Sequence, residues 1–295
     1  MMMHGISRMG NNTGITIIIP AYNEESAIQS TIAKIEKNPG NYEIIVIDDG
    51  STDKTFELIR DSGVIALRHT KNRGYGASLK TGIKKAKYDT IVITDADGTY
   101  PVDRIPELVG IFMDEELDMV VGARIGSHVR IPFIRRPAKW FITRLAIYLS
   151  GANIPDLNSG LRVMKKDIID KFIRLLPDGF SFTTTISLAM LTNNYSVKYV
   201  PIDYFKRSGK SKIKPIKDTL NFIQLIIRMV LYFDPLRIFL PLSLPLIFIG
   251  LPLIAYQAIF LRDISTVSVI ISLAGVQLLA IGMLADLIDK RSSVD

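Results

Sequence analysis

Residues 91–101 read Ile91-Val92-Ile93-Thr94-Asp95-Ala96-Asp97-Gly98-Thr99-Tyr100-Pro101, and this stretch decides the fold. Four β-favouring residues lead directly into two carboxylates one residue apart, followed by glycine and proline. We therefore predict a buried strand that ends in a surface loop. In an open α/β sheet, ligands bind in the crevice outside the carboxyl ends of the strands. Side chains alternate along a strand, so extended geometry would place Asp95 and Asp97 on the same side.

Two neighbouring carboxylates repel each other, and a bound cation removes that cost. Hard cations such as Mg2+ and Mn2+ prefer carboxylate oxygens, and the same cation could hold a diphosphate. Asp and Gly are also ordinary residues of solvated turns. By itself the stretch leaves a metal–diphosphate site and a plain turn as alternatives.

The residues before this stretch alternate between strands and helices. Predicted strands cover residues 15–20, 43–47, 64–67 and 91–94, and predicted helices end near residues 37, 60 and 87. Asn23 or Ser26 is the expected cap of the first helix, and Ser51 or Thr52 that of the second. Alternating elements predict a parallel sheet with right-handed crossovers.

Three of the predicted strands end in polar loops, at residues 22–24, 48–51 and 95–99. A nucleotide site on a doubly wound sheet needs such loops at one edge. The first strand is not followed by Gly-x-Gly-x-x-Gly, and the chain has no complete Walker motif, Gly-x-x-x-x-Gly-Lys-Ser. These absences argue against a dinucleotide dehydrogenase and a P-loop enzyme.

The C-terminal part of the chain predicts a membrane hairpin. Residues 238–261 and 264–285 contain no charged side chain, and each run exceeds the roughly 20 residues that a membrane-spanning helix needs. Arg262 and Asp263 between them fit a tight turn. Two buried helices of a soluble protein are the alternative, although such long uncharged runs are rare there.

The chain is basic, with a formal net charge of +7 over 295 residues. The basic residues cluster before the first span and after the second: Arg135, Arg136, Arg207, Lys210, Lys212, Lys214, Lys217, Lys290 and Arg291. We therefore expect an integral membrane protein with the preceding domain and both termini in the cytoplasm. Placement beside the spans favours anionic lipid over nucleic acid as the partner. Since the chain has no cysteine, disulfides and thiolate metal sites are excluded.

The expected domain organisation follows from these patterns. We predict a disordered leader at 1–13, an α/β domain at 14–212, an interfacial helix or linker at 213–235, two transmembrane helices within 236–287 and a cytoplasmic tail at 288–295. Residues 133–150 mix apolar and basic side chains, so we expect an interfacial amphipathic helix there, with ordinary core packing as the alternative. Small residues at Gly250, Ala274 and Gly275 would permit close helix contacts, including those of a homo-oligomer.

Several short motifs occur in one order along residues 15–212. They are Pro20-Ala21-Tyr22-Asn23-Glu24, Asp48-Asp49-Gly50-Ser51, Asn72-Arg73-Gly74-Tyr75-Gly76, Asp95-Ala96-Asp97, Val121-Gly122-Ala123-Arg124, Asn158-Ser159-Gly160-Leu161-Arg162 and Arg207-Ser208-Gly209-Lys210-Ser211-Lys212. The set resembles that of inverting family 2 glycosyltransferases with a GT-A (Rossmann-like) fold. More narrowly, it resembles the polyprenyl-phosphate sugar synthases, relatives of dolichyl-phosphate mannose and glucose synthases.

The resemblance implies three groups of site residues. The nucleotide sugar would contact Pro20, Ala21, Tyr22, Glu24, Asp48, Asp49, Arg73, Gly74, Asp95 and Ala96, with Asp49 or Asp48 reading the base. Mg2+ or Mn2+ would bind Asp97, with Asp95 and Thr99; Thr99 replaces a glutamine of the mannose synthases and is a weaker ligand. The acceptor phosphate would be held by Arg124, Arg207, Ser211 and Lys212.

The implied reaction transfers a sugar, with inversion, from a nucleoside diphosphate sugar to a dolichyl or undecaprenyl phosphate. UDP-glucose and GDP-mannose are the favoured donors, and the sugar itself is left open. Asp97, Arg124 and Arg207 would be catalytic, and Asp156 would orient the acceptor, act as a weak base or simply shape a turn. Thr183, Thr184 and Thr185 depart from relatives that carry an acidic residue in this helix. The rival functions are a processive polysaccharide synthase, which usually has more spans, and a silent nucleotide-sugar-binding membrane protein.

Overall fold

The computed structural model describes residues 14–125, 147, 154–205, 231 and 235–292. Of these, residues 14–125 and 154–205 belong to one compact unit, and residues 235–292 belong to a second. The leader at 1–13 and the residues Arg207, Ser211 and Lys212 lie outside the described residues. So do the predicted interfacial segments at 133–150 and 213–235, apart from positions 147, 231 and 235.

The first unit is built on a mixed sheet. Its described strands are β1 (Ile15–Ala21), β2 (Tyr42–Asp48), β3 (Ile65–Arg68), β4 (Thr90–Ile93), β5 (Met119–Ala123), β6 (Arg162–Lys165) and β7 (Val197–Pro201), in the order β3-β2-β1-β4-β6-β5-β7. Strands β1 to β4 pair in parallel, as predicted. β6 runs antiparallel to both β4 and β5, whereas β5 and β7 pair in parallel, so among the described strands only β6 departs from the expected parallel sheet.

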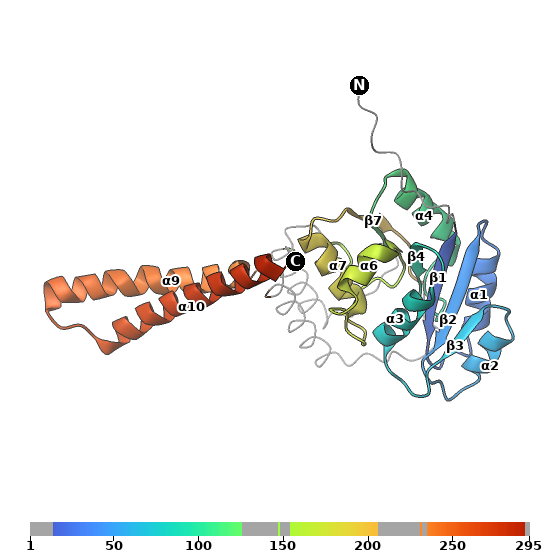
Figure 1. Ribbon diagram of the computed structural model, residues 1–295, viewed down its shortest axis with the longest axis horizontal. Coiled ribbons are helices and arrows are strands. Elements are labelled where there is room, and N and C mark those ends of the chain that lie inside the picture. The colour runs from blue at the N-terminus through green and yellow to red at the C-terminus, as the bar shows by residue number, and fades with distance from the viewer. Residues whose placement is uncertain (1–13, 126–146, 148–153, 206–230, 232–234, 293–295) are drawn as a thin grey trace, which may run out of the picture. The chain divides into compact units, whose positions relative to one another are not determined.

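Helices cover both faces of this sheet, with α1 and α2 on one side and α3, α6 and α7 on the other (Figure 1). The described helices of this unit are α1 (Ile28–Glu36), α2 (Thr55–Arg60), α3 (Tyr75–Lys85), α4 (Ile105–Asp114), α6 (Lys166–Phe172) and α7 (Phe182–Thr192). Ile17 and Ile19 share a buried core with α1 and α4, whereas Ile18 and Ile47 pack against Gly82 of α3. Burial on both faces explains why β1 is apolar apart from Thr16.

The strand register brings the predicted loops to one edge of the sheet. Ala21 at the end of β1 pairs with Asp48 at the end of β2, and the Asp49 amide donates to the Ala21 carbonyl at 2.8 Å. On the other side of β1, the Thr94 amide donates to the Ile18 carbonyl. The loops after β1, β2 and β4 therefore emerge side by side.

The second unit is a helical hairpin of α9 (Leu236–Tyr256), a π-helical turn (Gln257–Leu261) and α10 (Thr266–Ser292). The Gln257 side-chain oxygen accepts hydrogen bonds from the Ser265 amide and the Ser268 hydroxyl, which caps the start of α10. Two stretches, Leu236–Leu261 and Thr266–Ile288, are long and apolar enough to cross a membrane. Their bounds agree with the predicted spans to within a few residues.

Small residues let the two helices of this hairpin approach closely. A Cβ atom on Gly250 would lie 2.4 Å from the Ser272 hydroxyl oxygen, and one on Gly275 would lie 2.8 Å from Ile247. Gly250 and Gly275 therefore serve packing within the hairpin. The expected homo-oligomer contacts through these small residues stay a prediction.

Candidate active site

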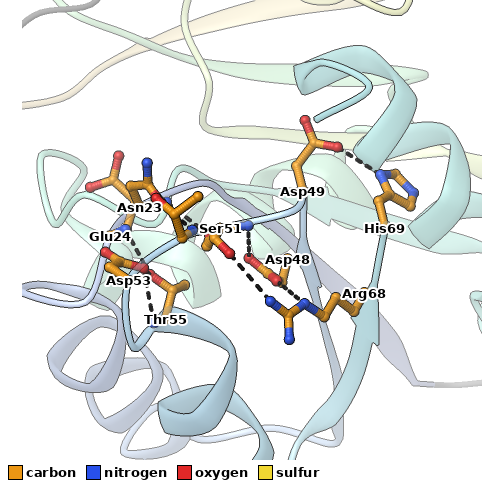
Figure 2. Close-up of polar contacts among 10 residues, drawn as sticks. Asn23, Glu24, Asp48, Asp49, Ser51, Asp53, Thr55, Arg68 and His69 are labelled. Carbon is orange, nitrogen blue, oxygen red and sulfur yellow. Dashed lines mark hydrogen bonds and ion pairs between the residues drawn. The ribbon is translucent and has the colours of Figure 1, made fainter. Parts of the chain in front are cut away.

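The loops after β1 and β2 are tied together by hydrogen bonds (Figure 2). The Asn23 amide donates to the Ser51 hydroxyl at 2.9 Å, and the Thr52 amide donates to the Asn23 side-chain oxygen at 2.8 Å. Asn23 adopts a left-handed backbone conformation (φ 51°), which asparagine tolerates better than most residues. The predicted helix caps were therefore wrong. Asn23, Ser51 and Thr52 join the two loops, and α1 and α2 begin after Ala27 and Lys54 without a side-chain cap.

Asp48 and Asp49 have different places in the second loop. Asp48 is fully buried and pairs with Arg68 at 3.0 Å. Asp49 accepts hydrogen bonds from the backbone amides of Arg73 and Gly74 at 2.9 and 2.8 Å, and its Oδ1 lies 2.7 Å from His69 Nδ1 (Figure 2). Only Asp49 of the two lines the adjoining cleft, so the structure favours Asp49 over Asp48 as the ligand contact.

A cleft of about 380 Å³ lies at this edge of the sheet, within the usual size range of small-molecule sites. Its lining residues are Pro20, Ala21, Tyr22, Glu24, Asp49, Asn72, Gly74, Tyr75, Ser78, Asp95, Ala96, Asp97 and Phe180. Most residues predicted to contact a nucleotide sugar are therefore brought together. Asp48 is not among the lining residues, and neither is Arg73, whose backbone amide serves to hold Asp49.

Asp95 and Asp97 both line the cleft, but a turn replaces the extended geometry expected after Thr94. β4 ends at Ile93, and Gly98 has a φ of 71° that favours glycine. The Thr99 amide and hydroxyl donate to one oxygen of Asp97, at 3.1 and 2.6 Å. Thr99 is fully buried and does not line the cleft. Its predicted role as a metal ligand is therefore corrected to that of orienting Asp97.

Asp95 is held between a tyrosine and a glycine. The Tyr75 hydroxyl donates to Asp95 Oδ1 at 3.0 Å. Burial, followed by the charge of Asp95, raises the pKa of Tyr75 well above its ordinary value and keeps the hydroxyl a donor. On the other side, a Cβ atom on Gly160 would lie 2.7 Å from an Asp95 oxygen. Among the residues that the structure describes, no group of three or more metal-ligating side chains occurs, so a cation here would need ligands from a bound diphosphate and water.

Arg124 and Asp156 form an ion pair beside this region. The Arg124 guanidinium donates to both Asp156 oxygens, at 2.7 and 2.9 Å, and it lies over the Tyr204 ring. Burial favours a higher pKa for Asp156, but the hydrogen bonds and charge of Arg124 outweigh it and hold the pKa below its ordinary value. A carboxylate so engaged is a weak base, and its contacts fit the orientation of Arg124.

Phe180 and Ser78 line the cleft although the sequence did not assign them a role there. Phe180 is 71% exposed and stacks on Tyr75 with ring centres 5.7 Å apart. The segment that carries it is held on α3 because the Ala77 amide donates to the Asp178 carbonyl at 3.0 Å. No local pattern could predict this wall, since it depends on contact between distant parts of the chain.

Comparisons with known proteins agree with this geometry. Residues 16–173 match the glycosyl transferase family 2 profile, and residues 234–290 match the GtrB C-terminal hairpin. The dolichyl-phosphate hexose transferase of Haloferax volcanii is 30% identical over 68% of this chain and 87% of its own length. Glycosyltransferase AglJ of the same organism is 29% identical over 93% of both chains.

The fold also matches solved structures. Glucosyl-3-phosphoglycerate synthase from Mycobacterium tuberculosis, crystallised with Mn2+, UDP-glucose and phosphoglyceric acid, superposes with a TM-score of 0.60 over 74% of this chain and 80% of that one, at 20% identity. This likeness identifies the α/β domain as a GT-A fold. Since the family profile covers more than half of the sequence, including most of the residues that line the cleft, the chain belongs to glycosyl transferase family 2.

Proposed function

We propose that this enzyme transfers a sugar from a nucleoside diphosphate sugar to the phosphate of a membrane polyprenol, with inversion at the anomeric carbon. UDP-glucose and GDP-mannose are the favoured donors. The observation that carries the proposal is the cleft in which Asp49, Asp95 and Asp97 come together from the loops of parallel strands. Support also comes from relatives named as dolichyl- and undecaprenyl-phosphate sugar transferases and from the apolar hairpin.

The donor would lie along the cleft, with its base near Asp49 and its diphosphate near Asp97. Asp49 is fixed by two backbone amides, and a carboxylate accepts hydrogen bonds from the ring N–H groups of uracil or guanine. Asp97, oriented by Thr99, and Asp95 fit Mg2+ or Mn2+, which favours one or two carboxylates together with substrate phosphates and water. A bound cation would neutralise charge on the departing nucleoside diphosphate.

The acceptor needs positioning more than it needs a base. A polyprenyl phosphate is already anionic at neutral pH, so its oxygen can attack directly, and the enzyme contributes orientation and charge stabilisation. Arg124, held by Asp156, supplies a guanidinium suited to phosphate oxygens. We extend this acceptor group to Arg207, Ser211 and Lys212 by family resemblance. The paired state of Asp156 favours a positioning role for it.

A donor panel tests the proposal. Purified full-length protein is incubated with Mn2+ or Mg2+, labelled UDP- and GDP-sugars and a polyprenyl phosphate, and organic-extractable label is counted with and without the lipid. We expect lipid-dependent label from one donor. Asp97→Asn should abolish it, whereas Asp103→Asn, an exposed aspartate next to the same loop, should retain it. Turnover by Asp97→Asn with unchanged metal dependence would contradict the proposal.

A further inference from the structure

Loop 156–160 touches both halves of the proposed site. Its first residue, Asp156, pairs with Arg124, and its last residue, Gly160, packs against the Asp95 carboxylate. The Gly160 amide also donates to the Tyr100 hydroxyl at 2.6 Å. A small movement of this loop would therefore displace the donor-side carboxylate and the acceptor-side arginine together.

A buried arginine fixes the middle of this loop. Arg162 is fully buried, and its guanidinium donates to the carbonyls of Leu157 and Ser159 at 3.0 and 2.8 Å. Its third strong contact is with the Ser187 hydroxyl on α7, at 2.6 Å. Among the described residues, no ion pair to Arg162 is formed by a carboxylate. Burying such a cation is costly, so its hydrogen bonds to the loop and to α7 must offset that cost.

Helix α7 holds the loop at a second point. The Thr184 hydroxyl, on a fully buried side chain, donates to the Asn158 side-chain oxygen at 2.5 Å. The neighbouring Thr185 is equally buried, but its hydroxyl donates to the Ser181 carbonyl within its own helix. Two adjacent threonines of the same helix therefore differ in whether they reach the loop.

We propose that Arg162 and Thr184 are positioning residues, which set the place of Asp95 and Arg124 by fixing loop 156–160 from β6 and α7. Thr184 would act through Asn158, and Arg162 through the two loop carbonyls. This assigns a role to Thr184, one of three consecutive threonines in α7. The inference rests on the proposed function where kcat is measured, because kcat requires sugar transfer. Nucleotide binding tests it without that requirement.

The threonine pair provides a matched test in the full-length protein. Thr184→Val removes the contact with the loop, and Thr185→Val removes a hydroxyl of the same kind that stays within the helix. Because misplacement by about 1 Å can lower rates about a hundredfold, we expect Thr184→Val to weaken Mn2+-dependent UDP or GDP binding and lower kcat, each by at least about fivefold. Thr184→Ser should restore both, and Thr185→Val should remain near wild type. Asn158 is exposed and can bond to water instead, so the Tm of Thr184→Val should match that of Thr185→Val.

A double-mutant cycle separates positioning from general destabilisation. If Thr184 acts through Asn158, adding Thr184→Val to Asn158→Ala should cause no further loss in binding or kcat. The inference would be overturned if the fold-losses of Thr184→Val and Asn158→Ala multiplied in the double variant. Equal losses in the Thr184→Val and Thr185→Val proteins would also overturn it. Wild-type protein that binds nucleotide but transfers no sugar to lipid would contradict the proposed function instead, and the binding comparison would still decide the role of Thr184.

Discussion

At the scale of the residue, the absence of a side chain at position 160 is as important as the carboxylates. A Cβ atom there would lie 2.7 Å from Asp95 Oδ1, so Gly160→Ala should displace Asp95 and weaken nucleotide binding at least about tenfold, by analogy with other active-site displacements. Gly110→Ala is the control because nothing lies within 4 Å of its added Cβ. Equal Mn2+-dependent UDP or GDP affinities in the two variants, measured by calorimetry, would contradict this account of Gly160.

The Arg124–Asp156 pair gives a prediction about pH. The pKa of Asp156 is lowered in the folded protein. The ion pair therefore stabilises the fold fully at pH values above the ordinary pKa of an aspartate, and this stabilisation is lost as the pH falls through the lowered pKa. Asp156→Asn leaves a largely buried guanidinium without its charge partner, which should cost about 3 kcal/mol near pH 7. The difference in Tm from wild type should shrink near pH 3. The control is Asp178→Asn, whose aspartate forms an exposed ion pair with Lys80, and its Tm should differ little from wild type at either pH. A loss of Tm in Asp156→Asn that does not vary with pH would contradict the lowered pKa of Asp156.

The sequence predicted individual residues well where they follow a strand directly. Asp49, Asp95 and Asp97 line the cleft as expected, because strand ends can be located from local patterns. Thr99 was misplaced because its sequence position does not reveal that its hydroxyl turns back to Asp97. The choice between Asp48 and Asp49 likewise depended on Arg68 and His69, which approach from β3 and its following loop.

At the scale of the element, α3 and segment 177–180 build one wall of the cleft. The added Cβ of Gly76→Ala would lie 2.1 Å from the Pro177 carbonyl oxygen, so this variant should push the segment away and move Phe180 off Tyr75. We expect weaker nucleotide binding and a lower Tm. Gly179→Ala is the matched control, because no atom lies within 4 Å of its added Cβ. Calorimetric binding and thermal unfolding of both variants test this, and a Gly76→Ala protein like wild type in both would contradict the packing.

Elements themselves were predictable to within a few residues, but their ends and partners were not. The first four strands and the helices between them follow from hydrophobic patterns. The helix starts differ because Asn23 and Ser51 bond to each other's loops in place of capping helices. The antiparallel β6 could not be predicted, since strand direction depends on the path of the chain through the intervening residues.

At the scale of the whole molecule, the hairpin was the most predictable feature, because a long uncharged run is visible in composition alone. Its orientation in the membrane is a further prediction. The basic residues that flank the spans predict that both ends of the hairpin lie in the cytoplasm and that the Arg262–Asp263 turn lies outside. The chain has no cysteine, so single-cysteine variants can report this directly.

We expect a membrane-impermeant maleimide to label Asp263→Cys in intact cells and to label Ser292→Cys only after permeabilisation. The two variants control each other, because in either orientation one of the two cysteines is protected in intact cells. Labelling of Ser292→Cys in intact cells, with Asp263→Cys protected, would show the opposite orientation and place the α/β domain on the other side of the membrane.

The central claim, transfer of the sugar alone from a nucleoside diphosphate sugar to a lipid phosphate, is tested most directly by product stoichiometry. With the active donor and polyprenyl phosphate, the soluble nucleotide and the lipid-linked sugar are quantified in the same reaction. Attack at the anomeric carbon predicts one nucleoside diphosphate released for each sugar attached to the lipid. Release of a nucleoside monophosphate, or of nucleoside diphosphate without a lipid-linked sugar, would contradict the account.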